Sequence, residues 1–389
     1  MRAPRDSAKA QLGFIALASH DWNDQWLGRQ QVMSRIAKRF HVVWSGPAHE
    51  WREIPGRLRS APTTEHPVAG LPMLHSYRPK AYLPQLYRPP ALATFLLQNR
   101  LKHARSILEA NGCTRILLSI WNPRYANVLP LVEHDMSMYH INDEYSFSPV
   151  ELPISEEERV LMAGADEVFI HSPAVMARKG KFCKSATLTP NGVDFDAFAK
   201  ERPLPEALAA IPGPRIGYSG FLKIQLNWDL LFDVAQKNPQ WSFVFVGKPL
   251  DQPGLADALT RIDALPNVHL IGGRSSVELS AYPQHFDVCM LPYRVDDYTK
   301  YIDPLKLGEY MASGRPAVGT PILPLQEAAS LIALADTPEE WSRSIEAALK
   351  PADNTAAERA RRQSWSRTRT WDAIVETILS KVEQHLGPF

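Results

Sequence analysis

The chain has 389 residues, of which 45% are hydrophobic and 22% charged, so its composition is that of a globular protein and excludes a disordered one. Its 43 Lys and Arg nearly balance 42 Asp and Glu, but residues 1–130 hold 18 of the basic and only 7 of the acidic residues. No carboxylate occurs between Glu65 and Glu109. This segregation predicts that part of the first half meets an anionic partner.

Length and cysteine usage narrow the class further. A chain of this length predicts two domains. The three cysteines, Cys113, Cys183 and Cys289, are isolated and form no metal-binding pattern, so we expect neither a disulfide framework nor a zinc site. No apolar run is long enough to cross a membrane, and the short one near the N-terminus is not typical of a signal peptide. We therefore expect a cytoplasmic protein.

Short apolar runs alternate with amphipathic stretches along the first half, which indicates a parallel sheet with helices on both faces. The strands expected here are Leu12–Ala18, His41–Trp44, Arg115–Ile120, Met136–Ile141, Glu167–Ile170 and Ala186–Thr189. The helices expected between them are Arg29–Arg39, Pro90–Asn111 and Ser155–Ala163.

The second half repeats this alternation after a Pro-rich, charged stretch near residues 195–214, which we interpret as a linker. Its expected strands are Arg215–Tyr218, Ser242–Val246, Val268–Ile271, Val288–Leu291 and Pro316–Gly319. Its expected helices are Trp228–Asn238, Gly254–Leu265, Ser275–Tyr282, Pro304–Ser313 and Pro338–Leu349. The prediction is an α/β protein of two Rossmann-like, doubly wound domains, residues 1–198 and 199–365, followed by a terminal helix over 366–389.

Loops that follow strands are the expected ligand-binding positions of such sheets. After the first strand of the second domain, Gly220 allows close backbone approach and Lys223 supplies a cation before a helix, which suits a diphosphate. Farther on, Lys306 and Glu309 lie three residues apart on one helical face, where they can hold a phosphate and a ribose hydroxyl pair. The dinucleotide pattern GxGxxG is absent from both first loops, which argues against a nicotinamide dehydrogenase.

The string PLKLGEYMASGRPAV, residues 304–318, resembles the nucleotide-sugar signature of GT-B glycosyltransferases of bacterial polysaccharide assembly. TPNGVDFDAF and FVFVGKP resemble further segments of that family. The resemblance implies two domains facing a cleft, with the terminal helix crossing back to the first domain. It also implies that Glu309 binds the ribose, that Lys306 binds phosphate, and that Leu307, Gly247 and Lys248 lie at the donor. No resident cofactor is implied, since the nucleotide-diphosphate sugar, with UDP favoured over GDP, is the substrate.

One departure concerns the stereochemistry. Many retaining members carry a glutamate eight residues before the ribose ligand, where this chain has Tyr301. Inversion is therefore slightly favoured, and it needs a base that deprotonates the acceptor hydroxyl. Asp143 is the first candidate, followed by Glu144 and Asp21, because all three follow strands of the first domain. The His20–Asp21 pair also resembles the xanthan-type membrane-associated glucuronosyltransferases.

The remaining donor candidates lie in two loops of the second domain. Tyr293 and Tyr301 can stack on the base or line the sugar pocket, and Arg274 follows a Gly-Gly turn where it can approach phosphate. No Asp-x-Asp motif lies in a donor loop, so we expect catalysis without a metal ion, with Lys306, Lys223 and helix-terminus amides balancing the leaving diphosphate.

The acid-free stretch of the first domain interleaves tyrosines with cations. Its basic residues are Arg78, Lys80, Arg88, Arg100, Lys102 and Arg105. We expect this surface to dock on an anionic membrane and reach a lipid-linked or oligosaccharide acceptor on the inner face of a bacterial membrane. A basic face that is merely solvated, or one that binds a soluble anionic acceptor, remains an alternative. No nucleic-acid-binding motif is present.

Two other functions stay open at this stage. One is a GT-B-fold epimerase that acts on the nucleotide sugar without an acceptor. The other is a non-catalytic nucleotide-sugar-binding component of a polysaccharide assembly complex.

Overall fold

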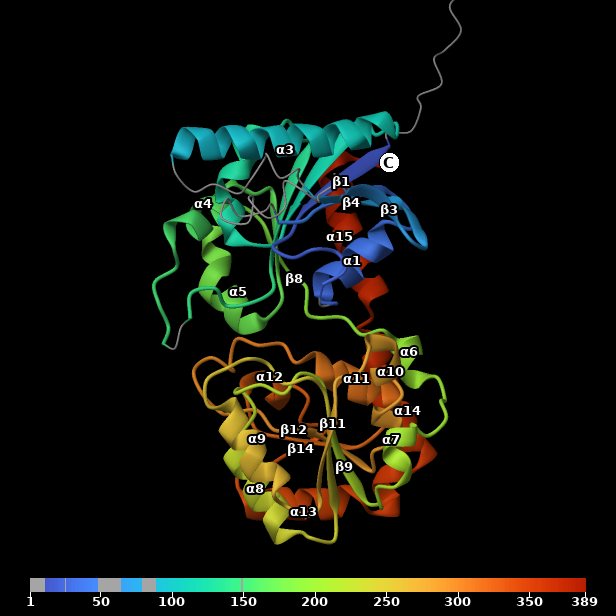
Figure 1. Ribbon diagram of the computed structural model, residues 1–389. Helices are drawn as coiled ribbons and strands as arrows, with labels where there is room; N and C mark the ends of the chain where they lie inside the picture. Colours follow the sequence, from blue (N-terminus) through green and yellow to red (C-terminus); the bar gives the residue numbers. More distant parts are fainter. Residues whose placement is uncertain (1–10, 25, 48–63, 79–88, 148–149) are drawn as a thin grey trace, which may run out of the picture. The chain divides into compact units, whose positions relative to one another are not determined.

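The computed structural model describes residues 11–24, 26–47, 64–78, 89–147 and 150–389 (Figure 1). The chain divides into two compact units. The first comprises Met1–Ser148, Leu152–Pro190 and Ile374–Phe389, and the second comprises Pro149–Glu151 and Asn191–Ala373. The division thus falls at Pro190, before the linker expected from composition, and the chain returns to the first unit only within its last helix.

The first unit is built on an eight-stranded sheet with the order β3-β4-β2-β1-β5-β6-β7-β8. Only the edge pair β3–β4 is antiparallel, and the other pairs are parallel. The central strands are fully buried apolar runs, as parallel sheets covered on both faces require. The strands are β1 (Leu12–Leu17), β2 (His41–Ser45), β3 (Thr64–Val68), β4 (Leu71–Arg78), β5 (Arg115–Ile120), β6 (Met136–Ile141), β7 (Glu167–Ile170) and β8 (Ala186–Leu188).

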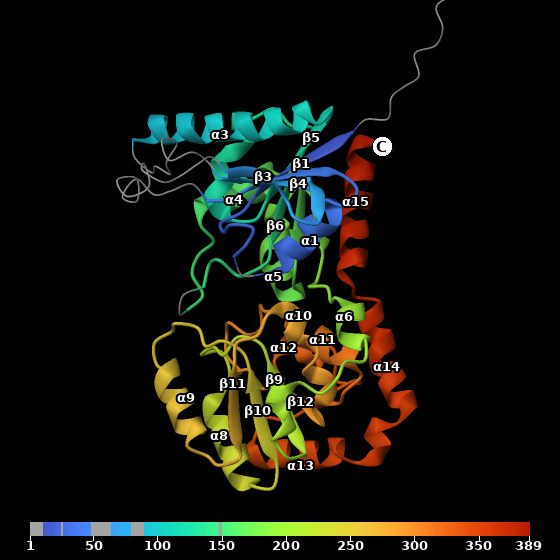
Figure 2. The same ribbon diagram turned by 45° about the vertical axis from the view of Figure 1, so that its right-hand side comes forward.

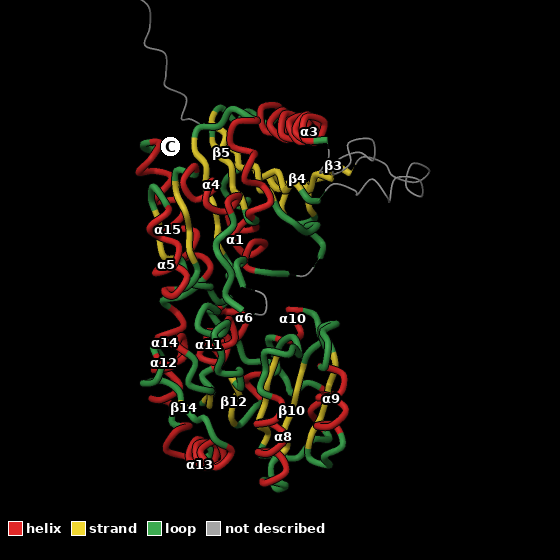
Figure 3. Tube along the Cα trace, turned by 90° about the vertical axis from the view of Figure 1, so that its left-hand side faces the viewer, coloured by secondary structure: helices red, strands yellow, loops and turns green. Residues whose placement is uncertain are grey.

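Helices flank this sheet, as the tube view shows (Figure 3). Three begin at hydroxyl caps: Ser155 accepts a hydrogen bond from the Glu158 amide, Ser172 accepts one from the Val175 amide, and Thr370 accepts one from the Ala373 amide. The helical elements are α1 (Gly28–Ile36), α3 (Pro90–Ala110), η2 (Pro123–Leu131), α4 (Glu156–Gly164), α5 (Pro173–Lys179), η3 (Gly180–Phe182) and α15 (Trp371–Leu386).

The C-terminal helix α15 lies beside the strands of the first unit (Figure 2). Contacts near the start and at the end of this helix hold it against the first unit. The Arg39 Nη1 atom lies 2.5 Å from a carboxylate oxygen of Glu376, and Arg115 donates to the Leu386 carbonyl at 2.7 Å. The last residues of the chain therefore complete the unit that contains its first strand.

The second unit contains a six-stranded, all-parallel sheet with the order β11-β10-β9-β12-β13-β14. Its strands are β9 (Arg215–Ser219), β10 (Ser242–Val246), β11 (Val268–Gly272), β12 (Val288–Leu291), β13 (Ala317–Gly319) and β14 (Ala333–Leu334). Its helices are α6 (Phe195–Ala199), α7 (Glu206–Ala209), α8 (Trp228–Lys237), α9 (Leu255–Asp263), α10 (Ser276–Leu279), η4 (Pro283–His285), α11 (Leu305–Ser313), α12 (Leu323–Gln326), α13 (Pro338–Ala348), η5 (Pro351–Asn354) and α14 (Ala356–Arg367).

Both sheets match the predicted α/β class, and the differences lie at edges and ends. The hairpin β3–β4 was not predicted, because Pro67, Gly70 and Pro72 interrupt the apolar alternation on which a strand prediction depends. The C-terminal region is two helices, α14 and α15, that meet near Thr370. No helix among the described residues is both long and apolar enough to cross a membrane.

Candidate functional site

Two glycines bring the β9 and β10 ends of the second unit together. Gly220 follows β9 with a φ of +140°, and its amide donates to the Val246 carbonyl at 2.8 Å. A Cβ on Gly247 would lie 1.8 Å from the Gly220 carbonyl oxygen, so only glycine fits there. A Cβ on Gly220 would lie 2.4 Å from Cε of Lys306. The missing side chain therefore makes the space in which the lysine lies.

Helix α11 presents the ion pair expected from the sequence. The Lys306 ammonium lies 2.8 Å from a carboxylate oxygen of Glu309, and each side chain is 15% exposed. The pair thus remains accessible at the carboxyl end of β9, beside the Gly220 backbone. Leu307, which was also expected at the donor, is buried in the core of the second unit, so its side chain packs between secondary-structure elements.

Tyr293 and Tyr301 are more deeply buried than side chains that stack on a nucleobase need to be. Tyr293 is 3% exposed, burial raises the pKa of its hydroxyl, and the Lys223 ammonium lies 5.5 Å from its ring centroid. Tyr301 is 5% exposed and donates to a Glu151 carboxylate oxygen at 2.5 Å. Both rings are therefore buried: Tyr293 packs beneath a cation, and Tyr301 is held by a carboxylate.

Lys248 and Arg274 follow the neighbouring strands β10 and β11. A Cβ on Gly273 would lie 3.3 Å from Cβ of Lys248, so these two loops touch. Arg274 donates to the Tyr282 hydroxyl at 2.9 Å and to the Gly273 carbonyl at 2.8 Å. It also lines a hollow of about 680 Å³ within the second unit, together with the segment 202–207.

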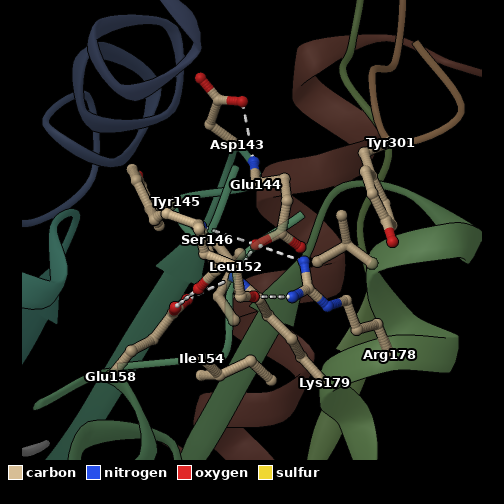
Figure 4. Close-up of polar contacts among 12 residues, drawn as sticks. Asp143, Glu144, Tyr145, Ser146, Leu152, Ile154, Glu158, Arg178, Lys179 and Tyr301 are labelled. Atoms are coloured by element: carbon tan, nitrogen blue, oxygen red, sulfur yellow. Dashed lines mark hydrogen bonds and ion pairs between the residues drawn. The ribbon is translucent and has the colours of Figure 1, made fainter. Parts of the chain in front are cut away.

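In the first unit, the loop after β6 carries the two leading candidates for a base (Figure 4). Asp143 is exposed, and its carboxylate accepts the Glu144 amide at 2.8 Å. Glu144 is 3% exposed and lies 2.8 Å from the Lys179 ammonium and 3.2 Å from Arg178. Its carboxylate also accepts the Ser146 amide at 2.9 Å. Glu144 is therefore placed to hold the loop that presents Asp143, and its burial does not suit direct contact with an acceptor.

A second buried carboxylate completes this cluster. Glu158 of α4 lies 2.7 Å from the Lys179 ammonium and accepts the Tyr139 and Ser146 hydroxyls at 3.3 Å. Burial is the main reason that the pKa of the Tyr139 hydroxyl is raised, so that side chain stays a donor. Lys179 and Glu158 were missed from the sequence, because the network joins residues of three distant segments.

Asp21 lies in the loop after β1. Its carboxylate pairs with Arg78 at the end of β4, at 3.3 Å, and its amide donates to Asp24 at 2.9 Å. A Cβ on Gly46 would lie 2.6 Å from an Asp21 carboxylate oxygen. The ends of β1, β2 and β4 thus meet around this carboxylate, as their adjacency in the sheet requires.

The basic residues of this stretch that the structure describes do not form one cationic face. Arg100 is 2% exposed and donates to the Gly46 carbonyl, so the prediction that it contacts a membrane surface is corrected. Arg105 is paired with Glu109 at 2.7 Å and with Glu133 at 3.2 Å. Lys102 is exposed, whereas Lys80 and Arg88 lie outside the described residues.

Comparison with known protein families gives a match within the second unit. Residues 213–351 match the family model described as "Glycosyl transferases group 1". A curated relative, the "Putative teichuronic acid biosynthesis glycosyltransferase TuaH" of Bacillus subtilis (strain 168), is 30% identical over 132 residues. That match spans 33% of this chain and 33% of the relative, about a third of each.

Solved structures match over nearly the whole chain. One is described as "Trehalose-6-phosphate from E. coli bound with UDP-2-fluoro glucose" and has a TM-score of 0.70 at 12% identity, covering 96% of this chain and 99% of that one. Anabaena Alr3699/HepE in complex with UDP-glucose has a TM-score of 0.62 at 14% identity, covering 96% and 99%. The chain has the GT-B fold of glycosyltransferases. The site described above therefore lies in a GT-B protein, with Lys306, Glu309, Gly220 and Gly247 all inside the segment that matches the family model.

Proposed function

We propose that this GT-B protein transfers a sugar from a nucleotide-diphosphate donor to a glycan or lipid-linked acceptor in bacterial cell-surface or exopolysaccharide synthesis. The observation that carries the proposal is the Lys306–Glu309 pair, whose ammonium lies beside Gly220 at the end of β9. A cation next to exposed backbone suits a diphosphate, and a carboxylate one helical turn away suits vicinal ribose hydroxyls.

A UDP-sugar is the donor that we favour, with a GDP-sugar as the alternative. Both structural neighbours described above hold a UDP-sugar, and the family match covers the unit that carries Lys306 and Glu309. On this proposal, Lys223 and the first turn of α11 share the diphosphate charge with Lys306, and no metal ion is needed.

The proposed reaction is a direct, inverting displacement. The acceptor oxygen attacks the anomeric carbon, the bond from that carbon to the diphosphate oxygen breaks, and the hydroxyl proton passes to a carboxylate. Asp143 is our candidate for that carboxylate, because it is exposed and its loop is held by the buried Glu144. The nucleoside diphosphate leaves with the bonding electrons, so atoms and charge balance.

We further propose that α3 brings the protein to the inner face of the cytoplasmic membrane. Phe95 is 57% exposed and Leu92 is 44% exposed on its first half, and the helix has no acidic residue before Glu109. Exposed apolar side chains followed by a cation such as Lys102 suit an anionic lipid surface.

Donor binding tests the central assignment. Titration calorimetry with UDP-glucose and GDP-mannose should show that Lys306→Ala and Glu309→Ala each weaken binding at least about tenfold, a change of about 1.4 kcal/mol. Arg361→Ala is the matched control, since Arg361 forms an exposed i,i+3 pair with Glu358 in the same unit. Unchanged donor affinity in both site variants would overturn the proposal.

A sugar-transfer assay distinguishes the role of the proposed base from that of the donor site. Asp143→Asn should abolish transfer to a lipid-linked acceptor, while donor affinity stays within about twofold and EDTA has no effect on the wild type. Conversion of the donor sugar without acceptor would instead indicate an epimerase. Donor binding without any conversion would indicate a non-catalytic component.

Vesicle binding tests the location. The double variant Leu92→Ser, Phe95→Ser should bind phosphatidylglycerol vesicles more weakly in a co-sedimentation assay. Val277→Ser is the control, because Val277 is 67% exposed in the second unit. Equal binding by the double variant and the wild type would remove α3 from the proposal.

A further inference from the structure

Arg29 is a buried cation that lacks an acidic partner. It is the second residue of α1, and its side chain and backbone together are only 5% exposed. Its guanidinium donates to Nδ1 of His20 at 2.7 Å, and its Nε–H has no hydrogen-bond partner among the described residues. Among those same residues no carboxylate lies within ion-pair distance of it.

The other deeply buried cations have different partners. Lys179 touches two carboxylates, whereas Arg362 and Arg100 donate to backbone carbonyls. Arg29 differs from them in donating to the ring of an exposed histidine. A buried charge costs several kcal/mol unless it is paired, and burial lowers the pKa of Arg29. A buried charge that is perturbed in this way is a candidate for a functional site.

Arg29 lies at the point in the first sheet where open α/β proteins bind ligands. Strand β1 pairs with β2 on one side and with β5 on the other, so the strand order reverses between β1 and β5. In open α/β sheets, ligands bind beyond the carboxyl ends of the strands at such a reversal of strand order. His20 is in the loop after β1, Arg124 follows β5, and α1 begins at Gly28.

The hydrogen bond to Arg29 fixes the role of His20. A guanidinium only donates, so Nδ1 of His20 is the acceptor, and the neutral ring carries its hydrogen on Nε2. Burial and the neighbouring Arg29 lower the pKa of His20, which keeps the ring neutral near pH 7. Because the residue is exposed, its Nε2–H is a donor available to a ligand.

We propose that Arg29 and His20, together with Arg124 and the first turn of α1, form an oxyanion site that binds a carboxylate or phosphate group of the acceptor. The Nε2–H of His20 donates to the anion directly, and Arg29 supplies the positive charge behind it. The assignment of this anion to the acceptor rests on the proposed function, because the donor diphosphate is assigned to the second unit. The binding chemistry itself is independent of that reaction.

The test uses the full chain and three probes: sodium glucuronate, inorganic phosphate and neutral glucose. We expect wild type to bind one or both anions and not glucose in a titration followed by ¹H–¹⁵N NMR. Arg29→Met and His20→Ala should each weaken anion binding at least about tenfold. Arg35→Met is the matched control, because Arg35 on the same helix donates to Gln31 one turn away. Phosphate binding without glucuronate binding would assign the site to a phosphate, and the converse to a uronate.

Separate control variants distinguish an effect on anion binding from an effect on folding or on the donor site. Arg29→Lys keeps the charge and should retain part of the affinity if Arg29→Met fails to fold. Anion affinity equal to wild type in Arg29→Met, or its loss in Lys306→Ala, would overturn the inference. Unchanged UDP-glucose binding in both Lys306→Ala and Glu309→Ala would overturn the proposed function and leave the oxyanion site standing.

Discussion

Two neighbouring regions at the carboxyl edge of the first sheet treat a buried cation in opposite ways. Below the loop after β6, the fully buried Lys179 ammonium at the end of α5 lies 2.8 Å from Glu144 and 2.7 Å from Glu158. Beside the loop after β1, Arg29 of α1 is 5% exposed and donates to the ring of His20, and no carboxylate among the described residues lies within ion-pair distance of it. The charge of Lys179 is therefore balanced by buried carboxylates, whereas that of Arg29 is not.

The difference separates a structural charge from a functional one. A buried cation with two carboxylates has no charge left for a ligand, so its contribution is to fix the loop that carries Asp143. A buried cation with a neutral partner keeps its charge available at the cost of stability. Burial alone would have grouped the two residues together, and only their partners distinguish them.

The largest effect is expected from breaking the network of Lys179, Glu144 and Glu158, which we call the Lys179 network. Lys179→Met leaves the buried Glu158 without a counter-charge and Glu144 with Arg178 alone, so the free energy of unfolding should fall by about 3–5 kcal/mol. Urea denaturation of the full chain measures it. Lys184→Met, at an exposed lysine five residues away, should change stability by less than about 0.5 kcal/mol. A loss below about 1 kcal/mol in Lys179→Met would mean that the network is not essential for the fold.

The same reasoning applied to a buried acid predicts a pH dependence. Burial raises the pKa of Asp303 to about 6, against an ordinary value of 3.8. The folded chain therefore holds this proton more tightly than the unfolded chain, and the stability that it contributes is lost as the pH rises from about 4 through 6, by at most about 3 kcal/mol. Asp303→Asn should flatten this part of the curve of urea midpoint against pH, and exposed Asp297→Asn should not. Parallel curves for wild type and Asp303→Asn would contradict the expectation.

A combined replacement tests whether unpaired carboxylates cause the loss of stability in the Lys179 network. The triple variant Glu144→Gln, Glu158→Gln, Lys179→Met removes all three charges together, so it should lose no more than about 2 kcal/mol and be more stable than Lys179→Met alone. Urea denaturation again provides the measurement. If the triple variant is the less stable of the two, the cost of Lys179→Met comes from lost packing and not from unpaired carboxylates.

The smallest effect is expected at the open region. Arg29→Met removes a buried charge that has no acidic partner among the described residues, so the free energy of unfolding should not fall by more than about 1 kcal/mol, and a rise is compatible with the cost of burying that charge. Thermal and urea unfolding of the same preparations used for anion binding provide the test. A loss as large as that of Lys179→Met would erase the distinction between the two regions.

The sequence predicted the fold well because its strands are buried, uninterrupted apolar runs. The prediction of the GT-B fold is confirmed. Gly220, Gly247 and Lys306, which the sequence singled out as donor candidates, lie close together in space, while their role in binding stays a prediction. Strand β4 was missed, because a proline and a preceding glycine turn hide its alternation.

Side-chain burial was harder to predict. Arg100 was counted as a surface cation, although it lies four residues from the buried Leu96 and Ala104 on the apolar stripe of α3. That spacing was the available signal. No comparable signal marks Arg29 or Lys179, because their partners lie on other segments and are chosen by tertiary packing.

The two points at which the chain enters and leaves the second unit suggest how domains could be exchanged in this protein. Val193, just after the chain enters that unit, donates to the Arg369 carbonyl at 2.9 Å, and Trp371 donates back to Val193 at 3.2 Å just before the chain leaves it. A Cβ on Gly192 would lie 2.6 Å from the Trp371 backbone nitrogen. The entry and exit are thus adjacent, as in a domain inserted into a host. Residues 191–373 are in this sense a cassette, and a donor unit from another GT-B protein could be grafted between the same two points.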